Sequence, residues 1–168
     1  MTKITPSPVG APAYRPGINP QAWRLILQAG LLAGTCDIVA AFVNYSLKTG
    51  KSPWPILNYI ASGVVGKEAA YEDVIPMRVL GMALHFLIAT IFAAIFYAAW
   101  PTIKKLTSNW VLAGLGYGIV VWCAMNLVVV PLSNTPAGKH TTSGVIINML
   151  ILMFCIGLPV AGIIARRR

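Results

Sequence analysis

The sequence predicts an all-α membrane protein, an antiparallel bundle of four transmembrane helices with a short interfacial or re-entrant helix in the first outer loop. Composition is the first reason: 57% of the 168 residues are hydrophobic and 10% are charged, whereas a soluble domain carries about 25% charged residues. The second is that four stretches reach the roughly 20 mostly apolar residues that a helix needs to cross a bilayer. Because backbone groups cannot stay unpaired in lipid, each stretch is expected to be helical.

The four predicted spans follow a polar N-terminal segment. Residues 1–24 contain five prolines and no apolar core of a signal peptide, so they are expected to form a cytoplasmic tail. Residues 25–168 are expected to form the transmembrane domain. Tryptophans at positions 23, 100 and 110 mark helix ends, as in an interfacial aromatic belt. The predicted spans are Leu25–Leu47, Val79–Trp100, Trp110–Pro131 and Gly144–Ala165.

The first outer loop, residues 48–78, is long enough to carry structure of its own. Its run Ser52-Pro53-Trp54-Pro55 indicates a break followed by a new helix start, because proline fits the first turn of a helix. Apolar residues then recur at helical spacing over about residues 56–65. A helix of about ten residues cannot cross the bilayer, so we expect it at the interface or re-entering the membrane. A lid on the bundle fits this pattern better than a pore helix.

Basic residues predict the orientation of the spans. The N-terminal tail, the loop between the second and third spans and the C-terminal tail hold eight Lys or Arg residues and no acid. The opposite side holds five basic and three acidic residues. Both termini are therefore expected to face the cytoplasm. The last three residues, Arg166, Arg167 and Arg168, are expected to anchor the chain at the lipid headgroups.

Small residues recur on one face of each predicted span. Such residues let helix backbones approach closely, so these faces are expected to be the buried ones of the bundle. The glycines expected at helix contacts are Gly30, Gly34, Gly81, Gly114, Gly118 and Gly162.

Polar side chains inside the spans are the candidate functional residues, because an ionised carboxylate at the bilayer centre costs about 2.5–3.5 kcal/mol. Asp37 is expected near the midplane, with His85 about one helical turn nearer the outer surface. Two interpretations are open. Asp37 and His85 form a protonatable pair, or a neutral, hydrogen-bonded Asp37 fixes helix register while asparagines bond across helices. The predicted intramembrane polar cluster is Asp37, His85, Asn44, Asn126 and Asn148.

Other kinds of site find little support. His140 in an outer loop is the only histidine besides His85, so the chain lacks two facing intramembrane histidines for a haem, and no cofactor is expected. The three cysteines, Cys36, Cys123 and Cys155, lie in apolar runs at mid-membrane and are expected to act as apolar filler rather than copper ligands. Hydrolase, phosphate-loop and zinc-protease motifs are missing, so we do not expect an enzyme. Although the net charge is +9, so few charged residues in total do not indicate nucleic-acid binding.

Four segments carry a resemblance to a known family: PILNYIASGVVGKEA (Pro55–Ala69), LGMALHFLIA (Leu80–Ala89), YGIVVWCAMNLVVVPLS (Tyr117–Ser133) and IGLPVA (Ile156–Ala161). Over about residues 26–168 the chain resembles the YagU-like proteins, small four-helix inner-membrane proteins of bacteria without an assigned biochemical activity. The resemblance implies a bacterial inner-membrane location. It also implies that the IASG turn, His85, Asn126 with the following VVVPLS, and Gly157-Leu158-Pro159 are signature positions.

Two functions follow as hypotheses. The first is a non-enzymatic accessory or structural subunit that lies in the lipid bilayer and packs against a larger membrane assembly or against copies of itself. Its motives are the small size, the apolar helix faces and the proline-rich tail. The alternative is a small proton-linked transporter, channel or acid-stress protein that uses Asp37 and His85.

Overall fold

The computed structural model describes residues 20–136 and 141–167. The predicted tail up to residue 19, His140 and Arg168 lie outside these ranges. The described residues form helices and no strand. Two of the elements, η1 and η2, are π-helical segments within longer helices. The elements are α1 (Pro20–Thr49), α2 (Pro55–Val65), α3 (Lys67–Glu72), α4 (Val74–Leu106), α5 (Trp110–Ala124), η1 (Met125–Val129), α6 (Val130–Leu132), α7 (Thr142–Ile151), η2 (Leu152–Gly157) and α8 (Leu158–Arg167).

The predicted fold class is confirmed, because four helical stretches are long and apolar enough to cross a membrane. They are Pro20–Thr49, Val74–Leu106, Trp110–Leu132 and Thr142–Arg167. The predicted short helix of the first outer loop is also present as α2. These helices extend past the spans predicted from the sequence at one or both ends, because a helix can continue beyond its apolar residues. The chain is therefore a multi-pass membrane protein.

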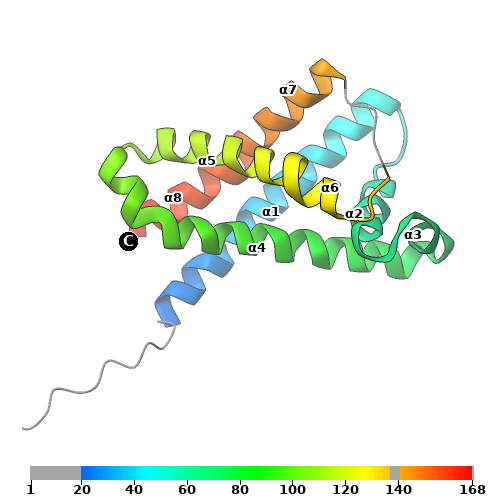
Figure 1. Ribbon diagram of the computed structural model, residues 1–168, viewed down its shortest axis with the longest axis horizontal. Helices are drawn as coiled ribbons and strands as arrows, with labels where there is room; N and C mark the ends of the chain where they lie inside the picture. Colours follow the sequence, from blue (N-terminus) through cyan, green and yellow to red (C-terminus); the bar gives the residue numbers. More distant parts are fainter. Residues whose placement is uncertain (1–19, 137–140, 168) are drawn as a thin grey trace, which may run out of the picture.

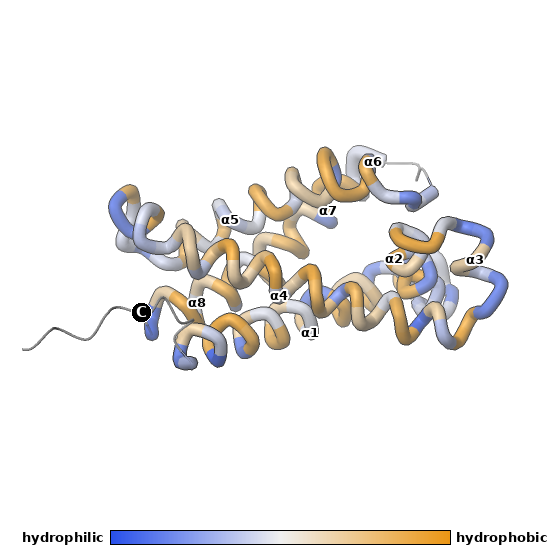
Figure 2. Tube along the Cα trace, turned by 60° about the horizontal axis from the view of Figure 1, so that its bottom comes forward, coloured by the Kyte–Doolittle hydropathy of each residue, from blue (hydrophilic) through white to orange (hydrophobic). Residues whose placement is uncertain are grey.

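Successive spans run in opposite directions, so each end of the bundle collects a set of helix ends (Figure 1). One end holds the start of α1, the α4–α5 connection and the C-terminal end of α8. The other holds α2, α3, α6 and the start of α7, and below it is called the open end. Within the bundle, α1 packs against α4 and α8, and α5 packs against η2 and α8. Hydrophilic segments gather towards the two ends (Figure 2).

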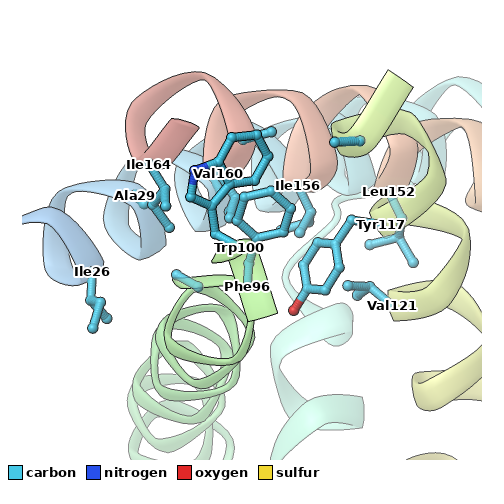
Figure 3. Close-up of a cluster of buried hydrophobic side chains, with 14 residues drawn as sticks. Ile26, Ala29, Phe96, Trp100, Tyr117, Val121, Leu152, Ile156, Val160 and Ile164 are labelled. Carbon is cyan, nitrogen blue, oxygen red and sulfur yellow. The ribbon is translucent and has the colours of Figure 1, made fainter. Parts of the chain in front are cut away.

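The buried core lies towards the end that holds the α4–α5 connection (Figure 3). Its centre is aromatic: the Phe96 ring stacks on Trp100 at 5.7 Å and meets Tyr117 edge-on at 4.8 Å between ring centroids. The Tyr117 hydroxyl donates a 2.6 Å hydrogen bond to the Phe92 carbonyl oxygen, which ties α5 to α4. By contrast, η1, α6 and α7 contain no buried residue. The third and fourth spans are thus tightly packed at one end and lack buried residues towards the other.

The first outer loop is a folded unit attached to α4. Asn58 of α2, which is 1% exposed, donates from Nδ2 to the carbonyl oxygens of Ala70 at 2.7 Å and Val74 at 3.3 Å. Arg78 of α4 donates from Nε to Asn58 Oδ1 at 3.2 Å. One amide side chain therefore joins α2, α3 and α4. Sequence analysis predicted neither α3 nor this role of Asn58.

Glycines stand where helix backbones meet. A Cβ atom on Gly114 or Gly157 would run into the backbone of the other, and one on Gly118 would meet the backbone of Met153. On the other side of the bundle, a Cβ on Gly81 would meet the backbone of Leu57. Gly30 lies against Thr90 and Gly34 against the Phe86 ring, whereas Gly162 lies less closely against the Trp110 ring. Gly157 is a contact that sequence analysis left out.

Replacing Gly157 by alanine is expected to destabilise the fold, because the new methyl group has no space against the Gly114 carbonyl. Overpacking of this kind costs about 1–3 kcal/mol of unfolding free energy. The matched control is Gly116→Ala on α5, where nothing lies within 4 Å of the added Cβ and where alanine gains up to about 1 kcal/mol of helix propensity. Thermal unfolding in detergent should separate the two variants, and equal midpoints would contradict the close backbone contact.

Candidate functional site

A cavity of about 370 Å³ lies inside the bundle and brings four of the predicted polar residues together. Asp37 comes from α1, His85 from α4, Asn126 from η1 and Asn148 from α7. The other lining residues are apolar or aromatic and come from every span and from α2: Ala41, Tyr59, Ile60, Ile88, Ala89, Phe92, Val121, Met125, Val130, Leu152 and Ile156. The cavity therefore combines an apolar wall with a few polar groups, as small-molecule sites do.

Asp37 has no hydrogen bond or direct ion pair with any residue that the structure describes. Among the described residues, the buried side-chain nitrogen or oxygen atoms without a partner are the indole nitrogens of Trp100 and Trp122. The Asp37 oxygens are not among them, so they are accessible from the cavity that Asp37 lines. The register interpretation predicts a hydrogen bond from Asp37 to a neighbouring helix, and the described residues form no such bond.

His85 is the one residue of the predicted polar cluster whose side chain bonds to another span within the described ranges. Its Nε2 lies 2.8 Å from the carbonyl oxygen of Gly34 on α1. A carbonyl oxygen can only accept, so Nε2 carries the proton and donates it, and Nδ1 is the atom left for a second partner. His85 and Asp37 line the same cavity without a direct ion pair between them.

The asparagines do not bond across helices as the register interpretation predicts. The Asn126 side chain donates from Nδ2 to the Trp122 carbonyl oxygen of its own helix at 2.9 Å. The side chains of Asn44 and Asn148 form no hydrogen bond with a described residue. These amides are therefore available to a bound solute or to water.

A second cavity of about 400 Å³ adjoins the first. The two share Ala41, Asn126 and Asn148 as lining residues, so they meet at these side chains. The second cavity contains Asn44 and continues along α1 to Lys48 and Thr49, the last turn of that helix, and to Thr141 at the start of α7. Together the two adjoining cavities extend from Asp37 to the open end of the bundle, and below they are called the passage.

Two π-helical segments border the passage. In η1 the Val130 N–H bonds the carbonyl of Met125, and in η2 the Leu158 N–H bonds that of Met153, each five residues earlier. A proline follows each segment by two residues, Pro131 and Pro159. Because a proline ring meets the carbonyl four residues earlier and lacks an N–H, the helix adjusts locally at that turn. Such π-segments occur mostly as single turns and frequently at functional sites.

Several residues outside the predicted cluster belong to the site. Tyr59 and Ile60 of α2 line the cavity that contains Asp37, so the short outer helix is part of its wall. The Trp122 indole N–H is buried without a hydrogen-bond partner among the described residues, and Trp122 lines the second cavity. The prolines of VVVPLS and IGLPVA are the sequence signal for the two π-segments beside the site.

Arg166 and Arg167 lie away from the cavities. The Arg166 guanidinium stacks over the Trp110 ring at 4.4 Å from its centroid. Arg167 donates from Nη1 to Gln28 Oε1 at 3.2 Å. Both contacts are at the end opposite the open end, in keeping with a role outside the site.

No group of three or more histidine, cysteine, aspartate or glutamate side chains that could hold a metal ion exists in the part of the chain that the structure describes. The three cysteines are half-buried and free. The predicted polar groups that line the cavity are thus a carboxylate, an imidazole and two amides.

Taken together, fold and site define a class: a multi-pass, all-α membrane protein with a mostly apolar cavity between its spans that holds a few polar side chains. No protein-family model, curated protein or solved structure matches this chain. The resemblance to the YagU-like proteins stays a prediction.

The ring of His85 is expected to hold its proton on Nε2 when neutral, because only that nitrogen faces the Gly34 carbonyl. Nitrogen-15 NMR of selectively labelled protein in detergent distinguishes the two ring nitrogens. A neutral ring with its proton mainly on Nδ1 would contradict the interhelical hydrogen bond.

Thiol labelling tests the passage. In a background without the native cysteines, Asn44→Cys is expected to react with a small charged methanethiosulfonate reagent, because Asn44 lines the second cavity. Ala33→Cys on the same helix is the control, since Ala33 is 0% exposed. Labelling of position 44 should occur from one side of the membrane only. Equal protection of both cysteines would contradict an open passage.

Proposed function

We propose that this protein is a small proton-linked transporter that binds a polar solute in the cavity beside Asp37 and His85. The observation that carries the proposal is the Asp37 carboxylate: it lies within a span, accessible from a cavity, and bonds to no described residue. A charged or polar group inside a membrane is costly and is retained where it has a function. A carboxylate that only fixed helix register would be bonded to a neighbouring helix.

The chemistry of the cavity supports this function. When Asp37 loses its proton, the cavity holds a negative charge that attracts a cationic solute or a proton. When Asp37 is protonated, that attraction is gone. The Nδ1 atom of His85 has no hydrogen-bond partner among the described residues. It can therefore bind and release a second proton near Asp37 while Nε2 stays bonded to the Gly34 carbonyl oxygen. The amides of Asn126 and Asn148 supply donors and acceptors for the rest of the solute.

Transport also requires access from the opposite side. The path in that direction is closed by the aromatic core of Phe96, Trp100 and Tyr117. Opening it would move α5 relative to α4, where the Tyr117–Phe92 hydrogen bond joins them. The π-segments η1 and η2 adjoin this core, and they are the parts of the third and fourth spans where the helix departs from regular α-helical geometry.

The proposed location is a bacterial inner membrane, with both termini in the cytoplasm and the open end outside. The distribution of basic residues supports this orientation, and the helix ends support it further by placing the start of α1 and the end of α8 at one end of the bundle. Reporter fusions at each terminus measure the side directly. The passage would then face the outside of the cell.

The accessory-subunit role stays a prediction. Gentle extraction followed by a native gel and mass spectrometry tests it, because a subunit would migrate with a larger complex at fixed stoichiometry. The cavity supports transport more directly, since a packing role requires no polar space between the spans.

Asp37→Asn is expected to abolish solute-driven charge movement while the protein still inserts and accumulates. Proteoliposomes on a solid-supported membrane are pulsed with small amines, amino acids, carboxylates and sugars, and the transient current is recorded. Asp73→Asn is the matched control, because Asp73 lies between α3 and α4 outside both cavities. Currents that persist in Asp37→Asn, or a wild-type protein that responds to none of these solutes, would overturn the proposal.

His85→Gln is expected to flatten the pH dependence of the same currents. Glutamine keeps an N–H donor for the Gly34 carbonyl but cannot change charge between pH 5 and 8, as imidazole can. Thermal unfolding provides the control for stability. If His85→Gln retains the wild-type pH profile, His85 has a structural role alone.

A further inference from the structure

An open groove of about 580 Å³ lies on the outer surface of α2 and α4, apart from both cavities. It shares no lining residue with the cavity beside Asp37. Its walls are apolar except for one cation, and we call it the α2–α4 groove. The residues that define it are Trp54, Ile75, Arg78, Val79, Met82 and Phe86.

The apolar walls of the α2–α4 groove face outward. Ile75 is 72% exposed and Val79 is 68% exposed. Both lie in the first two turns of α4, where the second span begins. Hydrocarbon surface at this position of a membrane protein is covered by lipid chains. Trp54, which also lines the groove, is 48% exposed, and tryptophan is enriched at the level of lipid headgroups.

Arg78 is held in place at the same groove. Its Nε donates to Asn58 Oδ1 at 3.2 Å, and Asn58 is itself buried and bonded to the Ala70 carbonyl oxygen at 2.7 Å. The two Nη groups donate to no residue that the structure describes, and no carboxylate there pairs with them. The guanidinium is therefore fixed on one edge and free on the other, beside an apolar surface where an uncompensated cation is costly.

We propose that the α2–α4 groove binds one phospholipid, with its phosphate on Arg78 and an acyl chain along Met82 and Phe86. Guanidinium groups match phosphate oxygens with two parallel hydrogen bonds, and such charge-assisted bonds are about twice as strong as neutral ones. Only a molecule with an anionic group at one end and a long apolar chain at the other complements both parts of the groove. A phospholipid of the surrounding bilayer has this chemistry.

Bound lipid would also touch the candidate site through one side chain. Phe86 lines the groove, its ring meets His85 edge-on at 5.5 Å between centroids, and it lies against Gly34. The lipid proposal does not depend on this contact, nor on the proposed transport. It concerns a separate surface and is tested separately.

Lipid titration of the full chain in detergent, read by native mass spectrometry, tests the proposal. Wild-type protein is titrated with dioleoylphosphatidylglycerol, and dioleoylglycerol serves as the probe with the same chains and no phosphate. We expect one phosphatidylglycerol to bind before any other, and dioleoylglycerol at least about ten-fold more weakly. Equal binding of the two probes would overturn the proposal, because it would indicate contact with the chains alone.

Variants assign the lipid to the groove. Arg78→Gln is expected to weaken phosphatidylglycerol binding at least about ten-fold, whereas Arg24→Gln, which removes a cation at the other end of the bundle, leaves it unchanged. Because Arg78→Gln also disturbs Asn58, Met82→Trp provides an independent test: it fills the groove and leaves the Arg78–Asn58 hydrogen bond in place. Wild-type affinity in a folded Arg78→Gln or in Met82→Trp would overturn the proposal.

Discussion

Backbone contact between α5 and η2 is the constraint on which the arrangement of this bundle depends. At Gly114, Gly118 and Gly157 the two helices lie so close that no side chain fits between them. In lipid there is little hydrophobic gain from joining helices, so close packing of this kind is what holds spans together. The contact draws one end of the bundle shut around Phe96, Trp100 and Tyr117. With that end closed, the spans diverge towards the other, and the cavities lie in the space between them.

The third and fourth spans, which make this close contact, also contain the irregular helical segments. Regular α-helical hydrogen bonding continues in α5 and α8, whereas η1 and η2 are π-helical. The η2 segment both contacts α5 and contributes Leu152 and Ile156 to the cavity wall. Pro131 and Pro159 account for the change, since each removes an N–H and displaces a carbonyl within its helix. Asn126 then bonds the Trp122 carbonyl from its side chain. The two prolines thus account for the local departures from helix geometry beside the site.

Hydropathy and helix periodicity are sufficient to predict the spans, the short outer helix and the glycine faces, because each depends on residues close together in the chain. The polar residues were also predictable as a group, since charged and amide side chains are rare within apolar runs. Their contacts were not. These contacts depend on how the helices are rotated against one another. Examples are the hydrogen bond of His85 to Gly34, the lack of a hydrogen bond between Asp37 and any described residue, and the bonds by which Asn58 joins α2 to α4. The prolines offered a signal for η1 and η2, but proline also occurs in α4, where Pro101 lies in a helix assigned as regular throughout.

The helix contacts also bear on how such a chain is assembled in the membrane. α1 packs against α4, and α5 packs against η2 and α8, so the four spans form two consecutive hairpins. Asp37 and His85 belong to the first hairpin, and Asn126 and Asn148 to the second. Each hairpin can therefore insert with half of the polar groups, and the cavity exists only after the two have docked. A solute that touched both halves would act as a bridge between them and would favour the assembled protein over separated hairpins in proportion to its concentration.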